Sequence, residues 1–372
     1  TSREGAIRLW GAPTGAHQAD LSGAVASRAC ALAPDGSWVA AGGRYGAIRL
    51  WATDVDLPKP SVGGRDEPMR GCAVVVPRGG EAASLVVAHT DDGTAAAWEL
   101  DTGERTGFEI GGAVDWACGA AAGPDGAWVL VPADLTALRR WNPVTGTVLG
   151  TLTADAEIAG FALDPTGSWA VAACRDGTLA RWDVATGHPL PPLAIPSASS
   201  VSSGPPGVPG PPGPRGAADA CAVSPDGRWV AAGGEDRTVR LWAAATGRLH
   251  RELAGHTDSV LGVVFSPDGE LLVSAAADHT VRVWQVDDGA SVVTLTGHQH
   301  TVRSGRFSPD GAWLATAGGD GALLIWDATT WTCAAVMRFD GGARDCAWLP
   351  PELGGGIILA CSAGLYRYDL DT

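Results

Sequence analysis

The chain has 372 residues, of which 45% are hydrophobic and 18% are charged. A chain of this length and composition can bury a large core, which excludes an intrinsically disordered protein. No apolar run approaches the roughly 20 residues of a membrane-spanning helix. The net charge of −15 repels DNA, RNA and anionic lipids, so we expect no nucleic acid and no membrane among the partners.

Tryptophans recur along the chain, each at the end of a short apolar run such as AIRLW or TVRVW. Successive members are 41 to 47 positions apart, except for one interval of 60. This register contains Trp10, Trp51, Trp98, Trp141, Trp182, Trp242, Trp284 and Trp326, and Tyr368 takes the next place. In six repeats a Pro-x-Gly turn precedes the tryptophan by 17 residues, at Pro34, Pro124, Pro165, Pro225, Pro267 and Pro309. A fixed repeat of this length indicates a propeller or a solenoid.

Each repeat has the pattern of β-strands. In residues 263–284, VVFSPDGELLVSAAADHTVRVW, three apolar runs rich in β-branched residues are separated by two turns. Pro-Asp-Gly supplies the glycine and the short polar side chain that a tight hairpin turn needs. A further turn and a fourth run follow the tryptophan. We therefore predict an all-β fold with four antiparallel strands in each repeat.

Two consecutive repeats carry a Gly-His pair, a serine or threonine, an aspartate and the tryptophan at matching positions. The sets are His256, Ser274, Asp278 and Trp284, and His298, Thr316, Asp320 and Trp326. These residues resemble the WD-repeat family of β-propellers, and the resemblance covers essentially the whole chain. It implies that each set forms a structural hydrogen-bond tetrad within one blade. The other repeats lack the Gly-His pair, so we expect fewer hydrogen bonds to hold their blades together.

The strand count and the resemblance together predict an eight-bladed propeller, as a single domain over residues 1–372. A third strand ends at Trp10 and a fourth lies near His17 to Leu21, whereas the C-terminal repeat ends on a third strand near Tyr368. We expect the N-terminal fourth strand to join the C-terminal blade and close the ring, because an open sheet edge invites aggregation. This count leaves one third strand surplus, either residues 4–10 or residues 364–369.

A second tryptophan register lies four residues after the turn proline, where the second strand begins. It contains Trp38, Trp128, Trp169, Trp229 and Trp313. A large flat side chain at a repeated position is suited to the space between neighbouring blades. We therefore assign these residues to packing and not to stacking on a ligand.

The interval of 60 residues contains a Pro/Gly-rich insertion over residues 191–216, between two blades. Its centre, GPPGVPGPPGPR, has the Gly-X-Y period of collagen, but four triplets are too few for a stable triple helix. We expect a flexible polyproline-II loop, and a proline-rich ligand for another domain is the alternative.

The eight cysteines include no C-x-x-C pair. Cys30, Cys221 and Cys346 each lie four residues before their turn proline, or the equivalent place, so they occupy matching positions in different blades. Such residues lie about a blade apart, which favours buried packing over disulfides and a reducing, cytoplasmic location. A His-x-His pair at 298 and 300 suggests zinc only weakly, because the tetrad already uses His298. We predict no metal and no cofactor.

In the family that this chain resembles, partners usually bind around the channel mouth, at the start of the innermost strands. The residues at or beside that position are Arg28, Arg70, Trp116, Asp219, Arg303 and Arg344. In an eight-bladed ring the four arginines fall on four adjacent blades. Since guanidinium groups suit carboxylates and phosphates, we expect this arc to bind an acidic segment of a partner or of the parent chain. Chance and solvation are the alternative explanation.

No linear catalytic motif occurs, so we predict that the chain is not an enzyme. The resemblance implies a protein-interaction scaffold or sensor, as the C-terminal part of a bacterial signalling protein with a switch ATPase or Ser/Thr kinase domain. The start without Met, inside a repeat, fits a piece of such a chain. One alternative is a propeller enzyme or a small-molecule-binding propeller that uses the central channel. A rigid spacer without any partner is another.

Overall fold

The computed structural model shows a chain built of β-strands. The described residues are 7–10, 17–21, 29–32, 38–42, 48–52, 69–76, 84–90, 94–100, 102, 104–111, 119–193, 218–338, 342–350, 356–361 and 364–368. Every element within them is a strand, as the sequence predicts. The chain forms two compact units, residues 1–59 and residues 60–372.

The first unit contains two small antiparallel sheets. β1 (Ile7–Trp10) pairs with β2 (His17–Leu21), at the places expected for a third and a fourth strand. β3 (Ala29–Leu32), β4 (Trp38–Gly42) and β5 (Ile48–Ala52) form a three-stranded sheet.

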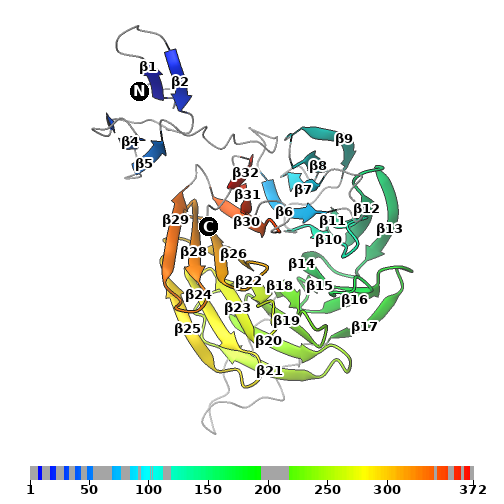
Figure 1. Cartoon of the computed structure of the whole chain (residues 1–372). Helices are drawn as coiled ribbons and strands as arrows, with labels where there is room; N and C mark the ends of the chain where they lie inside the picture. Colours follow the sequence, from blue (N-terminus) through cyan, green and yellow to red (C-terminus); the bar gives the residue numbers. More distant parts are fainter. Residues whose placement is uncertain are drawn as a thin grey trace. The chain divides into compact units, whose positions relative to one another are not determined.

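The second unit is a ring of sheets, each of which runs outward in chain order from an inner strand (Figure 1). Three four-stranded blades are β6 (Met69–Val75), β7 (Leu85–Thr90), β8 (Ala95–Glu99) and β9 (Arg105–Ile110); β10 (Ala121–Ala122), β11 (Val129–Asp134), β12 (Ala137–Asn142) and β13 (Thr147–Thr153); and β14 (Ile158–Leu163), β15 (Trp169–Cys174), β16 (Leu179–Asp183) and β17 (Pro189–Leu193). Three more are β18 (Ala218–Val223), β19 (Trp229–Gly234), β20 (Thr238–Ala243) and β21 (Leu249–Ala254); β22 (Val260–Phe265), β23 (Leu271–Ala276), β24 (Thr280–Gln285) and β25 (Ser291–Thr296); and β26 (Val302–Phe307), β27 (Trp313–Gly318), β28 (Ala322–Asp327) and β29 (Cys333–Arg338). The last sheet has three strands, β30 (Ala343–Trp348), β31 (Ile357–Cys361) and β32 (Gly364–Tyr368).

The predicted Pro-Asp-Gly turns join the first two strands of several blades. Gly227, Gly269 and Gly311 have φ between 70° and 75°, the left-handed region that favours glycine. In the turn between β22 and β23, the Ser266 hydroxyl donates to Asp268 Oδ1 over 2.5 Å. Serine, aspartate and glycine together therefore fix the turn, and the sequence interpretation of these hairpins is confirmed.

Hydrophobic clusters join each sheet of the ring to its neighbours. Seven clusters are described, and each combines buried residues of two adjacent sheets. Six members of the first tryptophan register lie in them, with at most 4% of each residue exposed: Trp98, Trp141, Trp182, Trp242, Trp284 and Trp326. Burial of one such side chain contributes about 2–3 kcal/mol. This packing explains why tryptophan is the most frequent aromatic residue of the chain.

The second tryptophan register packs between blades at three of its positions. Trp128 belongs to the cluster that joins its blade to β14–β17, and Trp169 and Trp229 pack against the clusters of the following interfaces. Trp313 departs from the pattern, because it is 36% exposed. The Trp38 side chain lies outside the described residues.

Arginines on the third strands add a contact between blades that the sequence did not suggest. The Arg181 guanidinium lies 4.5 Å from the Trp169 ring centroid, and its Nη1 donates to the Ala244 carbonyl of the next blade over 3.0 Å. Arg140 lies in the same way over Trp128 and donates to a carbonyl of the next blade. Each arginine therefore stacks on a tryptophan of its own blade and donates a hydrogen bond to a backbone carbonyl of the next blade.

The prediction of eight blades is wrong, because the ring has six four-stranded blades. The remaining place is filled by the three-stranded sheet β30–β32, which packs on β26–β29 and on β6–β9. In the second of these interfaces Ile358 and Ala360 lie in one cluster with Val86 and Trp98. Side-chain packing thus closes the ring of residues 60–372.

The predicted closure by the N-terminal strand is also wrong, since β2 pairs with β1. The number of tryptophan repeats therefore does not give the number of blades, because it does not show which repeats form the ring.

A buried carboxylate reinforces this closure. Asp345 on β30 is 3% exposed, and its Oδ1 accepts a hydrogen bond from the Ser304 hydroxyl (2.7 Å) and lies 3.1 Å from Arg306 Nη2, both on β26. Its Oδ2 accepts from the Cys72 backbone N–H on β6 (3.4 Å). A buried charge is tolerated only when it is paired and hydrogen-bonded. One side chain therefore connects three successive sheets.

Two of the three matching cysteine positions, Cys221 and Cys346, fall inside the ring. Cys221 on β18 and Cys346 on β30 occupy matching registers, and burial raises the pKa of each thiol to about 12. The described cysteines Cys72, Cys174, Cys221, Cys333 and Cys346 are free. The buried thiols stay protonated and pack as small apolar groups. Cys30 lies on β3, and its side chain is outside the described residues.

In the blade β22–β25 the four predicted tetrad residues form a continuous hydrogen-bond chain. Trp284 Nε1–H donates to Ser274 Oγ over 2.8 Å, and the Ser274 hydroxyl lies 2.7 Å from His256 Nε2. His256 Nδ1 lies 2.9 Å from Asp278 Oδ2. If neutral His256 carries its proton on Nδ1, every hydrogen bond of the tetrad has one donor and one acceptor. Burial lowers the pKa of His256, which favours this neutral form.

The blade β26–β29 repeats the arrangement with threonine in place of serine. Trp326 Nε1–H donates to Thr316 Oγ1 over 2.9 Å, and His298 Nε2 lies 2.9 Å from the same oxygen. His298 Nδ1 lies 3.1 Å from both carboxylate oxygens of Asp320. Burial alone would raise the pKa of Asp320, but the hydrogen bonds from His298 and the backbone outweigh it, and the pKa is lowered.

A blade without the Gly-His pair uses a different partner for its aspartate. In β18–β21, Asp236 Oδ2 lies 2.5 Å from Arg240 Nη1, and the Nε of the same arginine lies 2.8 Å from Glu252 Oε1. Arg240 thus links the turn before β20 to strand β21.

Most of the Pro/Gly-rich insertion is outside the described residues. Residues 191–193 belong to β17, and residues 194–217 are not described. The insertion joins the outer strand β17 to the inner strand β18, as expected from the repeat.

The tetrad predicts a specific loss of stability. Replacing Ser274 by Ala removes the hydroxyl that joins two buried groups. Trp284 Nε1–H and His256 Nε2 then lack this hydrogen-bond partner. We expect the free energy of unfolding to fall by about 1–3 kcal/mol, measured by urea denaturation. Ser291→Ala, at an exposed position on β25 of the same blade, is the control. Equal urea midpoints for the two variants would show that the tetrad does not stabilise the blade.

Candidate functional site

The predicted binding positions that the structure describes lie at one end of the inner strands. We call this end the loop face and define it by the loops before β14, β18, β22, β26 and β30 and the turns β15–β16, β19–β20, β23–β24 and β27–β28. In antiparallel sheets these connections share one end, because each lies at the start of an inner or a third strand. Loops held by a rigid scaffold are where proteins usually carry binding residues.

Three predicted side chains are described on the loop face. Arg303 is the second residue of β26 and is exposed, and Arg344 is the second residue of β30 and is half-buried. Asp219 is the second residue of β18, and its side chain is 10% exposed.

The expected arc of four arginines on adjacent blades is only partly reproduced. β26, β30 and β6 belong to consecutive sheets, so the backbone positions of Arg303, Arg344 and Arg70 follow one another around the ring. The Arg70 side chain, Arg28 and Trp116 lie outside the described residues. Because β30–β32 packs directly on β6–β9, no blade containing Arg28 separates these two sheets.

Two histidines from different blades meet on the loop face. His279 in the turn β23–β24 and His300 in the loop before β26 are both exposed, and their rings stack with centroids 5.8 Å apart. His279 has φ 68°, at the turn position that Gly177 and Gly321 occupy in other blades. A non-glycine residue in this conformation is uncommon. Sequence comparison of the turns shows the replacement, but not the stacking partner.

A cluster of carboxylates surrounds one arginine on another part of the loop face. Arg175 Nη1 lies 3.1 Å from Asp219 Oδ1 and 3.8 Å from Glu235 Oε1, and Arg175 Nε lies 3.6 Å from Glu157 Oε1. Glu157, Arg175 and Glu235 come from the loops and turns of two adjacent blades. This group, which we call the Arg175 cluster, has more negative than positive charge.

The pKa of Asp219 is raised to about 6. Burial is the main cause, the nearby Glu235 adds to it, and Arg175 opposes both. The folded protein therefore binds a proton at Asp219 more tightly than the unfolded chain, whose aspartates titrate near pH 4. By linkage, folding stability falls as the pH rises from about 4 to about 6.

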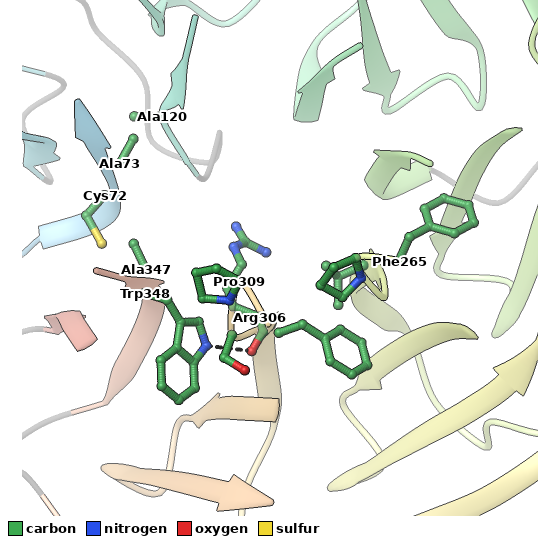
Figure 2. A pocket seen from close by; sticks show the side chains of 12 residues that line it. Cys72, Ala73, Ala120, Phe265, Arg306, Pro309, Ala347 and Trp348 are labelled. Carbon is green, nitrogen blue, oxygen red and sulfur yellow. Dashed lines mark hydrogen bonds between the residues drawn. The ribbon is translucent and has the colours of Figure 1, made fainter. Parts of the chain in front are cut away.

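The inner strands also surround a cavity in the central channel. Its volume is about 390 Å³, within the range of small-molecule sites. Figure 2 shows the guanidinium group of Arg306 beyond Pro309, on the side away from the Trp348 indole. The lining is otherwise mostly apolar and includes Phe265, Pro267, Phe307, Pro309 and Trp348.

The described residues contain no group of three histidine, cysteine or acidic side chains placed to hold a metal ion. Nor is any helix in this part of the chain long and apolar enough to cross a membrane.

The Arg175 cluster predicts an unusual pH dependence. Asp219→Asn removes a carboxylate that is costly to ionise, while Glu157 and Glu235 still accompany Arg175. We expect the variant to be more stable than the parent chain by about 2 kcal/mol at pH 7 and equally stable near pH 4. Urea denaturation across this pH range measures the difference.

Asp183→Asn is the matched control. Asp183 lies in an exposed turn in which Asn142 fills the equivalent place of the preceding blade. Hydrogen bonds from Thr186 lower the pKa of Asp183, so this change should give no gain at pH 7. A pH-independent effect of Asp219→Asn would contradict the assignment.

Comparison with known proteins agrees with the repeat architecture. The WD domain, G-beta repeat family matches residues 15–52, 146–183, 212–243, 247–285 and 289–327. A search of curated proteins found no match. The matched segments together cover half of the chain, and four of the five lie in the ring of residues 60–372. The chain therefore belongs to the WD40 repeat family.

Proposed function

We propose that the chain is a non-catalytic protein-interaction module whose loop face binds an acidic segment of a partner protein. WD40 propellers generally serve as scaffolds for protein interactions, and this fold suits that role. The observation that carries the proposal is the position of Arg303 and Arg344 on adjacent sheets of the loop face. Fold alone does not specify a partner, so the chemistry of these side chains has to supply the specificity.

Arg303 and Arg344, with the stacked histidines, lie on the sheets β22–β32, whose loops and turns also carry Asp258, Asp278 and Asp320. The Arg175 cluster lies on β14–β21. The net charge of −15 repels acidic ligands at long range, so an acidic segment would be held only by direct contact with the two arginines. Such an arrangement orients a partner as well as attracting it.

The wider role that we propose is recognition within a larger bacterial signalling protein in the cytoplasm. The propeller would bind a trigger protein, or would hold an upstream ATPase or kinase region in an inactive state. Both alternatives use the same loop face, and both involve an acidic surface opposite the two arginines.

The experiment measures binding of a fluorescein-labelled decaglutamate peptide to the whole chain by fluorescence anisotropy. Decalysine serves as the peptide of opposite charge. We expect the double variant Arg303→Glu with Arg344→Glu to weaken decaglutamate binding by about tenfold or more. Binding should also weaken as the salt concentration rises.

The control is the double variant Arg228→Glu with Arg248→Glu. Both residues are exposed and lie in turns at the opposite end of the strands, so the variant has the same net charge without altering the loop face. If both double variants weaken binding equally, net charge and not the loop face controls the interaction. Tighter binding of decalysine than of decaglutamate by the parent chain would also contradict the proposal.

A ligand-binding channel is the second candidate function. The cavity around Arg306 favours it, because its lining combines apolar residues with a single cationic group.

A further inference from the structure

One register position of the inner strands is apolar in every sheet of the ring except one. Cross-strand pairing with the second strand defines the position. Six sheets carry alanine or valine there: Ala73, Ala121, Ala162, Ala222, Val264 and Ala347. The seventh carries Arg306, opposite Ala315. The packing of the ring therefore does not require a charged residue at this position.

The ion pair with Asp345 uses one edge of the Arg306 guanidinium group and does not explain the rest of that group. Nη2 lies 3.1 Å from Asp345 Oδ1, and Nη1 donates to the Gly305 carbonyl over 3.1 Å. A guanidinium group has five N–H donors, so the remaining ones are available. The Arg306 side chain is 40% exposed, whereas that of Asp345 is 5% exposed. The cation faces the cavity and its carboxylate partner is buried behind it.

The other polar groups of the cavity lining are already occupied. Trp348 Nε1–H donates to the Arg306 carbonyl over 2.9 Å, which also fixes the indole (Figure 2). The Ser308 hydroxyl donates to Asp310 Oδ1 over 2.5 Å. Burial raises the pKa of the Cys72 thiol well above its usual value, so it remains uncharged. Arg306 is therefore the group of this lining that can bind a charged ligand.

We propose that this cavity is a binding site for a small apolar monocarboxylate, for which phenylacetate is the probe. The ligand carboxylate lies against the free edge of the Arg306 guanidinium, because the planar fork of donors matches two carboxylate oxygens. Its apolar body lies against the channel wall that includes Val264, Pro267 and Pro309. The volume of about 390 Å³ accommodates a single ring with a short side chain.

The charge of the site favours a monoanion over a phosphate dianion. Arg306 is shared with Asp345, so the site is close to neutral, and each negative charge on the ligand adds repulsion in a chain of net charge −15; a dianion is therefore disfavoured more strongly than a monoanion. A neutral aromatic amide of the same shape would lose the charge-assisted hydrogen bonds, which are about twice as strong as neutral ones.

The test titrates the whole chain with phenylacetate by isothermal calorimetry, with phenylacetamide and inorganic phosphate as matched ligands. We expect phenylacetate to bind at least about tenfold more tightly than phenylacetamide. Phosphate should not displace it at equal concentration. Comparable affinities for the acid and the amide, or no binding of phenylacetate at about 10 mM, would overturn the proposal.

Three variants separate binding from folding. Arg306→Lys keeps a positive charge beside Asp345 but loses the fork, and should weaken phenylacetate binding about fivefold or more. Ala347→Leu fills the cavity and should abolish binding. Ser304→Ala removes a partner of Asp345 without changing the lining, and should leave the affinity within about twofold. An unchanged affinity in Arg306→Lys, or an equal loss in Ser304→Ala, would show that Arg306 serves only the structure.

Discussion

Every sheet of the ring has two apolar faces, and both must be covered by neighbouring sheets. This constraint requires a closed ring, because a terminal sheet with one uncovered face would expose its tryptophan cluster to water. The structure meets the requirement between β30–β32 and β6–β9, where apolar side chains pack across the interface. The buried Asp345 adds hydrogen bonds to both flanking sheets at the same place. The positions of all loops and of the channel lining depend on this closure.

Because the core maintains the strands, the two ends of the ring and the channel can carry residues that the fold does not need. The loop face combines the Arg175 cluster with Arg303 and Arg344, and the channel contains Arg306 at a position where the other sheets have five alanines and one valine. The two sites are chemically different. We propose an acidic protein segment as the ligand of the first and a small carboxylate as the ligand of the second.

The sequence predicted the local structure well. The tryptophan interval and the Pro-Asp-Gly turns identified the strands from β10 onward, because turn chemistry and alternation of side chains act over a few residues. The blade number was wrong because closure depends on contacts between residues far apart in the chain. Ile358 and Val86 are ordinary apolar residues, and nothing in either segment indicates that they meet. Arg306 and the stacked His279 and His300 were missed for the same reason, since each acquires its role from a neighbouring sheet.

Hydrogen exchange of the backbone amides of β6 and β30 tests the closure of the ring most directly. The measurement compares the whole chain with residues 60–372 produced alone. If β30–β32 closes on β6–β9, the amides of Cys72 and of β30 should be equally protected in both proteins. Loss of protection in these two strands after removal of residues 1–59, with β22–β25 still protected, would show that the N-terminal unit is needed to close the ring.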